Sequence, residues 1–176
     1  MDALYFLVDS VLTFAVYAFL LRVLLQLARA DFRNPLAQAV LALTNWLVMP
    51  LRRVLPPAGR VDTASVVALL AVQLAATLVL FRLRTGALYP VVPLALEALR
   101  SLALATLLLY TILIFVYAAL SFVAPGARSP ATAILASLCE PVLRPLRQVL
   151  PVVGGIDFSP LVAIVGFTAL RILIGS

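Results

Sequence analysis

Four long apolar stretches alternate with shorter polar and basic stretches along this chain. The apolar stretches cover residues 3–28, 63–81, 98–123 and 158–174. The first three are long enough for an α-helix that crosses a hydrocarbon core of roughly 30 Å, and the fourth is barely long enough. The pattern therefore predicts an all-α membrane protein with four transmembrane helices.

A segment of mixed character lies between the two spans of each half. Asn34 as N-cap and Pro35 at the first helical position predict a helix start, and apolar residues then recur at helical spacing. About a dozen residues are too few to cross a bilayer, so we expect an amphipathic helix in the membrane interface, ended by Pro50. In the second half Ser129 is the expected N-cap and Pro141 the expected end. The predicted interfacial segments are 34–60 and 129–155.

The chain contains an internal duplication. The sequence PLRRVLPPAGRVD at 50–62 returns as PLRQVLPVVGGID at 145–157, 95 residues later, and the same offset carries the first apolar stretch onto the third. We therefore predict two repeats, residues 1–88 and 89–176. Each consists of a transmembrane helix, an amphipathic interfacial helix with a Pro/Arg turn, and a second transmembrane helix. Because each repeat has an even number of spans, the two repeats are expected to be parallel.

The distribution of arginine predicts the orientation in the membrane. Most arginines lie in the connections 29–62 and 124–157, and fewer lie in the connection between the repeats. By the positive-inside rule the two arginine-rich connections are cytoplasmic and both termini are outside. The first apolar stretch lacks the basic start of a signal peptide, so we expect it to be retained. We expect a multi-pass protein of the plasma membrane, or of the bacterial inner membrane.

Composition excludes several function classes. The chain is 65% hydrophobic and 11% charged, which lies outside the range of soluble globular proteins. Its net charge of +6 comes from arginines placed between apolar stretches, a pattern that favours anionic phospholipid over nucleic acid. One cysteine and no histidine exclude an internal disulfide and remove the usual metal ligands. We expect no metal, no cofactor and no enzymatic activity.

The Pro/Arg turns hold the candidate contact residues. Asp62 and Asp157 open the following spans at equivalent positions, where a carboxylate can accept backbone N–H groups or pair with a turn arginine. A catalytic pair of carboxylates is a third interpretation of these two residues, but helix capping explains each more simply. The basic candidates for contact with lipid phosphate or with a protein partner are Arg52, Arg53, Arg144 and Arg147.

Two polar residues lie inside the predicted spans. Arg22 has two interpretations: its guanidinium extends along the helix to the lipid head groups, or it faces a partner helix or polar cavity within the membrane. Gln73 also has two: it hydrogen-bonds across helices, or it lines a polar path. The second repeat has no counterpart of the intramembrane arginine, because Tyr117 occupies the position 95 residues after Arg22.

Several motifs together resemble a known family. They are Leu21-Arg22 with Gln26, PLRRVLP at 50–56, EPVLRPLR at 140–147 and GGIDFSP at 154–160. This pattern resembles the YggT (YlmG) family of small integral membrane proteins of bacteria and plastids. The resemblance implies a multi-pass membrane protein associated with ion and osmotic homeostasis, with organisation of division or chromosome segregation, and in plastids with cytochrome assembly. It implies no catalytic residue.

Two functions are compatible with these features. The first is a non-enzymatic scaffold or assembly factor that contacts anionic phospholipid and either a membrane-protein partner or further copies of itself. The alternative is a component of ion transport or osmotic homeostasis, in which Gln73 and Arg22 line a route through the membrane. The scarcity of acidic residues in the spans favours the scaffold.

Overall fold

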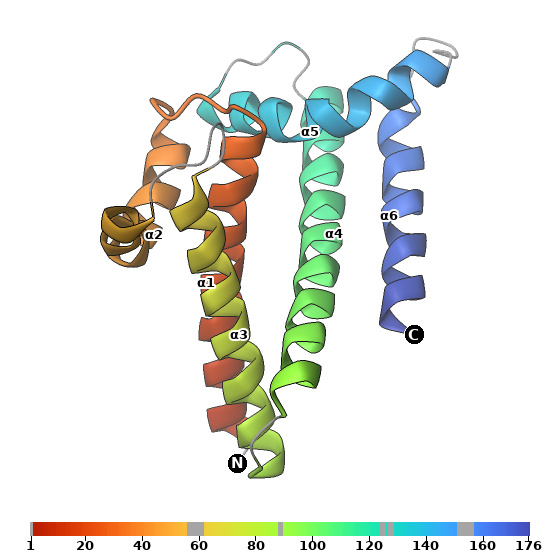
Figure 1. Ribbon diagram of the computed structural model, residues 1–176. Helices are drawn as coiled ribbons and strands as arrows, with labels where there is room; N and C mark the ends of the chain where they lie inside the picture. Colours follow the sequence, from red (N-terminus) through yellow and green to blue (C-terminus); the bar gives the residue numbers. More distant parts are fainter. Residues whose placement is uncertain (1, 56–61, 88–89, 124–125, 127–128, 151–156) are drawn as a thin grey trace. The chain divides into compact units, whose positions relative to one another are not determined.

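The structure is a computed structural model that describes all residues except 1, 56–61, 88–89, 124–125, 127–128 and 151–156. The described residues form six α-helices and contain no strand (Figure 1). The predicted all-α class is therefore confirmed. The helices are α1 (Asp2–Leu27), α2 (Pro35–Val54), α3 (Thr63–Thr85), α4 (Val91–Val123), α5 (Pro130–Val149) and α6 (Ser159–Gly175).

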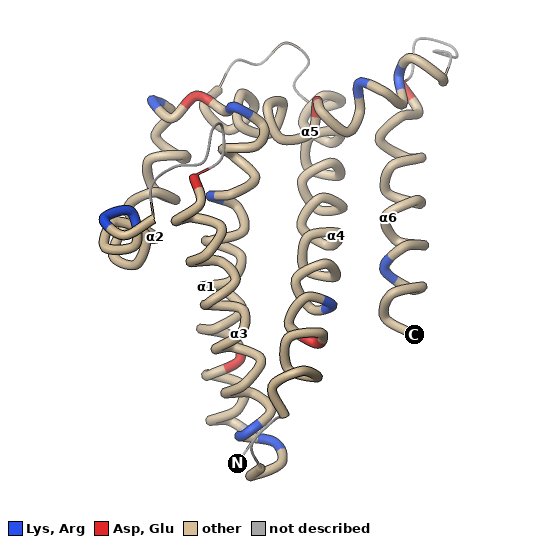
Figure 2. Tube along the Cα trace, viewed as in Figure 1, with Lys and Arg blue, Asp and Glu red and all other residues tan. Residues whose placement is uncertain are grey.

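Three helices, α1, α3 and α4, are long and apolar enough to cross a membrane. Helix α6 is apolar but has 17 residues. At 1.5 Å per residue it extends about 26 Å, slightly less than a typical hydrocarbon core. Figure 2 shows that charged residues lie toward the ends of these four helices and that their middle parts carry none. The four-span arrangement stays a prediction.

The interfacial helices do not end where the sequence suggested. We expected Pro50 and Pro141 to terminate them, but α2 continues through Pro50 to Val54 and α5 continues through Pro141 and Pro145. All three prolines are exposed. Proline has no backbone N–H, so the carbonyl four residues earlier loses its hydrogen bond, which costs less on an exposed face than in the protein interior. The buried face of each helix stays intact, and α5 bends along its length (Figure 1).

The third long helix also differs from the prediction. We expected it to begin near residue 98, but α4 begins at Val91. Pro93 therefore lies in the first turn, where backbone N–H groups have no partner within the helix and proline is tolerated. At the end of α3, Gly86 adopts a positive φ of 70° and donates its N–H to Arg82. Glycine takes this conformation without strain.

The chain forms two packing units. Unit 1 comprises residues 1–26 and 39–103, and unit 2 comprises residues 27–38 and 104–176. In unit 1, α1 and α3 lie side by side and bury Phe19, Leu25 and Ala68 with Val48 of α2 (Figure 1). This division concerns packing, and the repeats at 1–88 and 89–176 stay a prediction.

In unit 2, α5 lies across the ends of α4 and α6 (Figure 1). The buried cluster consists of Ile114, Cys139, Leu143 and Ala163. Burial raises the pKa of the Cys139 thiol to about 12, with the charge of Glu140 as a smaller cause.

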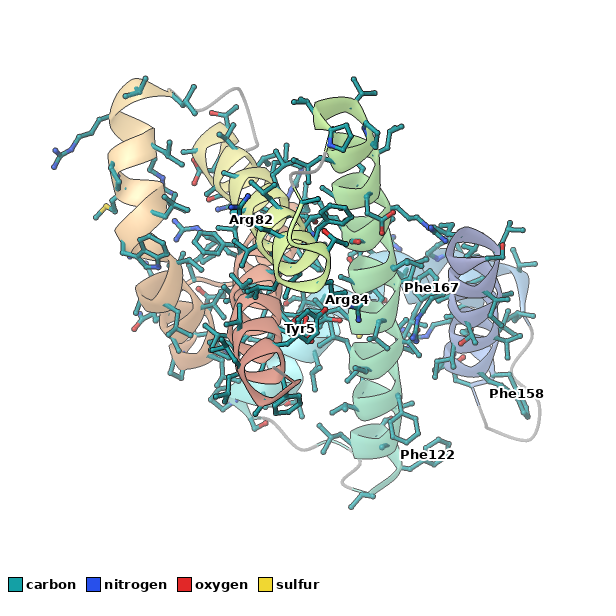
Figure 3. The ribbon with its side chains drawn as sticks, turned by 90° about the horizontal axis from the view of Figure 1, so that it is seen from below. Tyr5, Arg82, Arg84, Phe122, Phe158 and Phe167 are labelled. Atoms are coloured by element: carbon teal, nitrogen blue, oxygen red, sulfur yellow. The ribbon has the colours of Figure 1, made fainter. Side chains whose placement is uncertain are left out.

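Aromatic contacts add to the packing of each unit. In unit 1, the Arg84 guanidinium lies 5.0 Å from the ring centre of Tyr5 (Figure 3), which joins the far ends of α1 and α3 by a cation–π contact. In unit 2, the rings of Tyr110 and Phe167 lie 5.8 Å apart and join α4 to α6. Phe122, at the end of α4, is largely exposed.

Candidate functional site

In unit 1, an ion pair connects the last turn of α2 to the start of α3. Arg52 donates from Nε to Asp62 Oδ2 at 3.0 Å, and its Nη2 donates to the same oxygen. The Asp62 side chain is only 14% exposed, whereas that of Arg52 is 46% exposed. The neighbouring Arg53 is also exposed. Arg52 is therefore paired with a carboxylate, although its side chain remains partly exposed.

Of the two roles considered for Asp62, its side chain pairs with Arg52 and does not cap α3. It occupies the N-cap position, but its backbone carbonyl accepts the N–H groups of Ser65 and Val66. The carboxylate instead accepts from Arg52 and, at 2.7 Å, from the Ser65 hydroxyl. A guanidinium is a stronger partner for a carboxylate than a neutral backbone amide, which explains this orientation.

Arg22 lies at the centre of the polar contacts in unit 1. Its side chain is 0% exposed, so the interpretation that it extends to the lipid head groups is wrong. Nε donates to Ser65 Oγ at 2.9 Å, and Nη1 donates to Thr44 Oγ1 at 2.7 Å and to Asn45 Oδ1 at 2.9 Å. A fully desolvated arginine thus joins α1 to both α2 and α3. All three hydrogen-bond acceptors are neutral.

The Ser65 hydroxyl connects Arg22 to Asp62. It accepts from Arg22 and from Gln26 Nε2 at 3.0 Å, and it donates to Asp62. Arg22 Nη2 and Gln26 Oε1 are buried and have no hydrogen-bond partner within the part of the chain that the structure describes. We call the whole network the unit 1 cluster; its members are Arg22, Gln26, Thr44, Asn45, Arg52, Asp62 and Ser65.

Unit 2 contains a second arginine network. Arg147 donates from Nε to Asp157 Oδ2 at 2.7 Å and from Nη1 to Glu140 Oε2 at 2.9 Å. Tyr117 of α4 also acts on this guanidinium, as a further cause of its raised pKa. Arg144, one turn earlier on α5, is exposed. We call Tyr117, Glu140, Arg147 and Asp157 the unit 2 cluster.

The ion pairs shift the pKa values of both aspartates below the ordinary 3.8. For Asp62 burial acts in the opposite direction, but hydrogen bonds from Arg52 and Ser65 and the arginine charges outweigh it and lower the pKa. For Asp157 burial is likewise outweighed, by Arg147 and by the Ser159 backbone N–H, which donates to Oδ1 at 2.9 Å. Asp157 thus combines an ion pair with a bond to the backbone of α6.

The pKa of Arg147 is raised above its ordinary value. Burial alone would lower it, but the hydrogen bonds of Asp157 and Tyr117 and the charges of Asp157 and Glu140 have the larger effect. Arg147 is therefore fixed in its charged form by two carboxylates.

The two predicted N-cap residues lie at the starts of their helices in unit 2. Asn34 Oδ1 accepts the N–H of Leu36 at 2.9 Å, and its amide donates to the carbonyl of Pro130 at 2.8 Å. Ser129 forms a capping box with Thr132, in which each side chain accepts the backbone N–H of the other residue.

Gln73 is buried, and among the described residues its side chain bonds only within α3, whereas one of its two interpretations was a hydrogen bond across helices. Its amide donates to Thr77, one turn later on α3, at 3.2 Å. Asp62 and Asp157 belong to different units, and each is bound by its own arginine. Within the described residues, no group of three or more acidic, cysteine or histidine side chains could hold a metal ion.

Sequence reasoning missed most neutral partners of the clusters. Ser65, Thr44 and Asn45 bind Arg22 although they lie 22 to 43 residues away in the chain. A usable signal existed: Arg22 and Gln26 are four residues apart and so lie on one face of α1, which requires polar partners on a neighbouring helix. Ser65, three residues after Asp62, was the nearest candidate.

Acidification is expected to destabilise the fold. Because the folded-state pKa values of Asp62 and Asp157 lie below the unfolded value near 3.8, their ion pairs stabilise the folded protein above about pH 4. This contribution is lost as the pH falls through the folded-state values. Unfolding of the protein in detergent, followed by circular dichroism from pH 7 to pH 3, measures the loss. Asp62→Asn/Asp157→Asn should show a weaker pH dependence, and an equal dependence would contradict the assignment.

Comparison with known proteins places the chain among its relatives. The CCB3/YggT family model matches residues 1–83 and 96–176. A protein of Escherichia coli K12 named uncharacterized protein YggT is 38% identical over 164 residues, which cover 93% of this chain and 85% of that protein. An uncharacterized protein of Vibrio alginolyticus is 33% identical over 177 residues, which cover 99% of this chain and 95% of that protein.

A third relative is an uncharacterized protein of Pseudomonas aeruginosa, 35% identical over 155 residues that cover 88% of this chain and 77% of that protein. No solved structure matches the chain. The family model covers most of the chain in two stretches, and the E. coli relative covers nearly all of it. The chain therefore belongs to the CCB3/YggT family.

Proposed function

We propose that this protein is a non-enzymatic scaffold or assembly factor of the plasma membrane, or of the bacterial inner membrane. Four helices, α1, α3, α4 and α6, cross the bilayer, and both termini lie outside. The connections 29–62 and 124–157 lie on the cytoplasmic side. There the Pro/Arg turns contact anionic phospholipid and a membrane-protein partner or a second copy of the chain.

Exposed apolar surface supports the membrane location. Large apolar side chains are exposed along α4, among them Leu99, Phe115 and Phe122, and along α6, among them Val165 and Ile172. Surfaces of this kind are costly in water and suit lipid acyl chains or a partner helix.

Matching burial in the two units supports the tandem-repeat arrangement. The four residues of the unit 2 core each lie 95 positions after a buried residue of unit 1. The pairs are Phe19 and Ile114, Thr44 and Cys139, Val48 and Leu143, and Ala68 and Ala163. The two stretches matched by the family model also begin 95 residues apart. Two parallel copies of one helix arrangement account for these coincidences.

The observation that carries the proposed function is the pair of ion pairs, Arg52 with Asp62 and Arg147 with Asp157. Each joins the last turn of an amphipathic helix to the start of the next span. Among the described residues, one further exposed arginine lies beside each pair: Arg53 in unit 1 and Arg144 in unit 2. Partly exposed ion pairs contribute only about 0–1 kcal/mol, so stability alone explains little. Attraction to an anionic surface adds about 1 kcal/mol per arginine and accumulates over the turns.

We expect the protein to retain phosphatidylglycerol in preference to phosphatidylcholine, and Arg52→Ala/Arg147→Ala to reduce this preference. Native mass spectrometry of protein released from mixed-lipid micelles measures the retained lipid. Arg82→Ala/Arg84→Ala is the matched control, since it removes the same charge from the last turn of α3, at the opposite end of that helix from Asp62. Equal retention of both lipids by the wild-type protein would contradict the proposal.

A flux measurement tests the alternative of ion transport. Ion flux into proteoliposomes that Gln73→Leu abolishes would favour that function, because Gln73 is buried in the middle of α3.

A further inference from the structure

The two clusters share one ion pair but differ in their other charges. Arg147 and Asp157 lie 95 residues after Arg52 and Asp62, and both pairs are formed. At the same offset Tyr117 replaces Arg22, and Glu140 replaces Asn45. The unit 1 cluster therefore has an additional cation, and the unit 2 cluster has an additional anion.

The additional cation of unit 1 has no carboxylate bonded to it. Arg22 is fully buried, its hydrogen bonds go to the neutral side chains of Ser65, Thr44 and Asn45, and its Nη2 has no partner among the described residues. Asp62 accepts from Arg52 and reaches Arg22 only through the Ser65 hydroxyl. A desolvated charge is weakly screened, so Arg22 leaves a positive potential around Arg52.

The additional anion of unit 2 has the opposite effect. Arg147 is bound by both Glu140 and Asp157, so two negative charges face one positive charge. Among the described residues, one exposed arginine lies next to each cluster in the sequence: Arg53 in unit 1 and Arg144 in unit 2. With these included, the unit 1 cluster has three arginines and one carboxylate, whereas the unit 2 cluster has two arginines and two carboxylates.

The two amphipathic helices also differ in the apolar surface that they expose, and α2 exposes more of it than α5. On α2 the outer face exposes Leu43, Trp46 and Met49. These side chains suit the acyl boundary, and the final turn then places Arg52 and Arg53 at the level of the head groups. On α5, a fully described helix, Val149 at the end is the only large apolar side chain that is exposed.

We propose that unit 1 alone binds the phosphate group of an anionic lipid, through Arg52 and Arg53, and that the unit 2 cluster does not. This inference rests on the proposed function, because it requires the Pro/Arg turns to meet the membrane surface. It assigns Arg22 a positioning role: the residue touches no lipid, and its uncompensated charge keeps Arg52 attractive to phosphate while Arg52 is paired with Asp62.

A reciprocal exchange tests the proposal. Asn45→Glu places a carboxylate beside Arg22 Nη1, where Asn45 Oδ1 now accepts at 2.9 Å, and gives unit 1 the acid of unit 2. Glu140→Asn removes one of the two acids on Arg147 and gives unit 2 the amide of unit 1. Arg52→Ala and Arg147→Ala are examined singly beside them. The readout is retention of phosphatidylglycerol relative to phosphatidylcholine by native mass spectrometry.

Asn45→Glu and Arg52→Ala are expected to lower the phosphatidylglycerol preference about fivefold, the effect of one arginine charge at a membrane surface. Arg147→Ala should leave the preference unchanged, and Glu140→Asn should leave it unchanged or raise it. Asn45→Glu also provides a folding control, because pairing Arg22 with a carboxylate should preserve the unfolding midpoint while lipid retention falls.

Three outcomes overturn the inference. Equal losses in Arg52→Ala and Arg147→Ala would show that both turns bind lipid, and the proposed function would stand. Unchanged retention in Asn45→Glu would remove the role of Arg22. Binding of inorganic phosphate to protein in phosphatidylcholine nanodiscs, without a phosphatidylglycerol preference, would make free phosphate the ligand. Absence of any lipid preference in the wild-type protein, with or without phosphate binding, would also end the proposed function itself.

Discussion

Ser65→Ala is expected to destabilise the protein by roughly 2 kcal/mol, because it leaves Arg22 Nε buried without an acceptor. The Ser65 hydroxyl is fully buried and also bonds Gln26 and Asp62, so a single oxygen atom of α3 accepts hydrogen bonds from two side chains of α1. The loss of one oxygen creates little empty volume, and the effect therefore reports on hydrogen bonding. Unfolding in mixed micelles, followed by helicity, measures the change.

Ser159→Ala is the matched control. Ser159 is also a buried serine in the first turn of an apolar helix, but its hydroxyl has no hydrogen-bond partner among the described residues. Removal of an unpaired buried hydroxyl should be neutral or slightly stabilising. If both substitutions reduced stability equally, the importance of the Ser65 contacts would be refuted.

Leu143→Ala is expected to cost about 3 kcal/mol of stability. Leu143 is completely buried and belongs to the cluster in which α5 packs on α4 and α6. Removing most of its side chain leaves a cavity that the neighbouring Ile114 and Ala163 cannot fill without movement of their helices. The measurement is the same unfolding experiment.

Val149→Ala, on the same helix, serves for comparison. Val149 is 80% exposed, so its truncation should change stability by less than about 0.5 kcal/mol. A comparable loss at both positions would mean that α5 does not bury the face that contains Leu143.

Local features of the fold were predictable from the sequence. The start of α2 after Asn34 and the start of α5 after Ser129 follow from side chains that bond backbone groups two or three residues away. The apolar stretches gave the long helices to within a few residues at most ends. Such features depend on neighbours in the chain, which a linear sequence displays directly.

The polar network of unit 1 could not be predicted in the same way. The partners of Arg22 lie on two other helices, and the choice between head groups and helix partners depends on how those helices pack. Asp62 shows the same difficulty, because backbone amides and Arg52 were both available and only their relative positions decide between them. The continuation of α2 through Pro50 likewise depends on which face of that helix is buried.

Each packing unit contains one residue whose signal can be followed separately. Trp46, the only tryptophan, lies in unit 1 with its ring edge-to-face against Phe19 at 6.2 Å, and Cys139, the only cysteine, is buried in unit 2. Indole fluorescence therefore reports on loosening of one unit, and the rate of thiol alkylation on opening of the other. Both signals can be recorded on the natural chain without added probes. The order in which the two units unfold can therefore be measured directly.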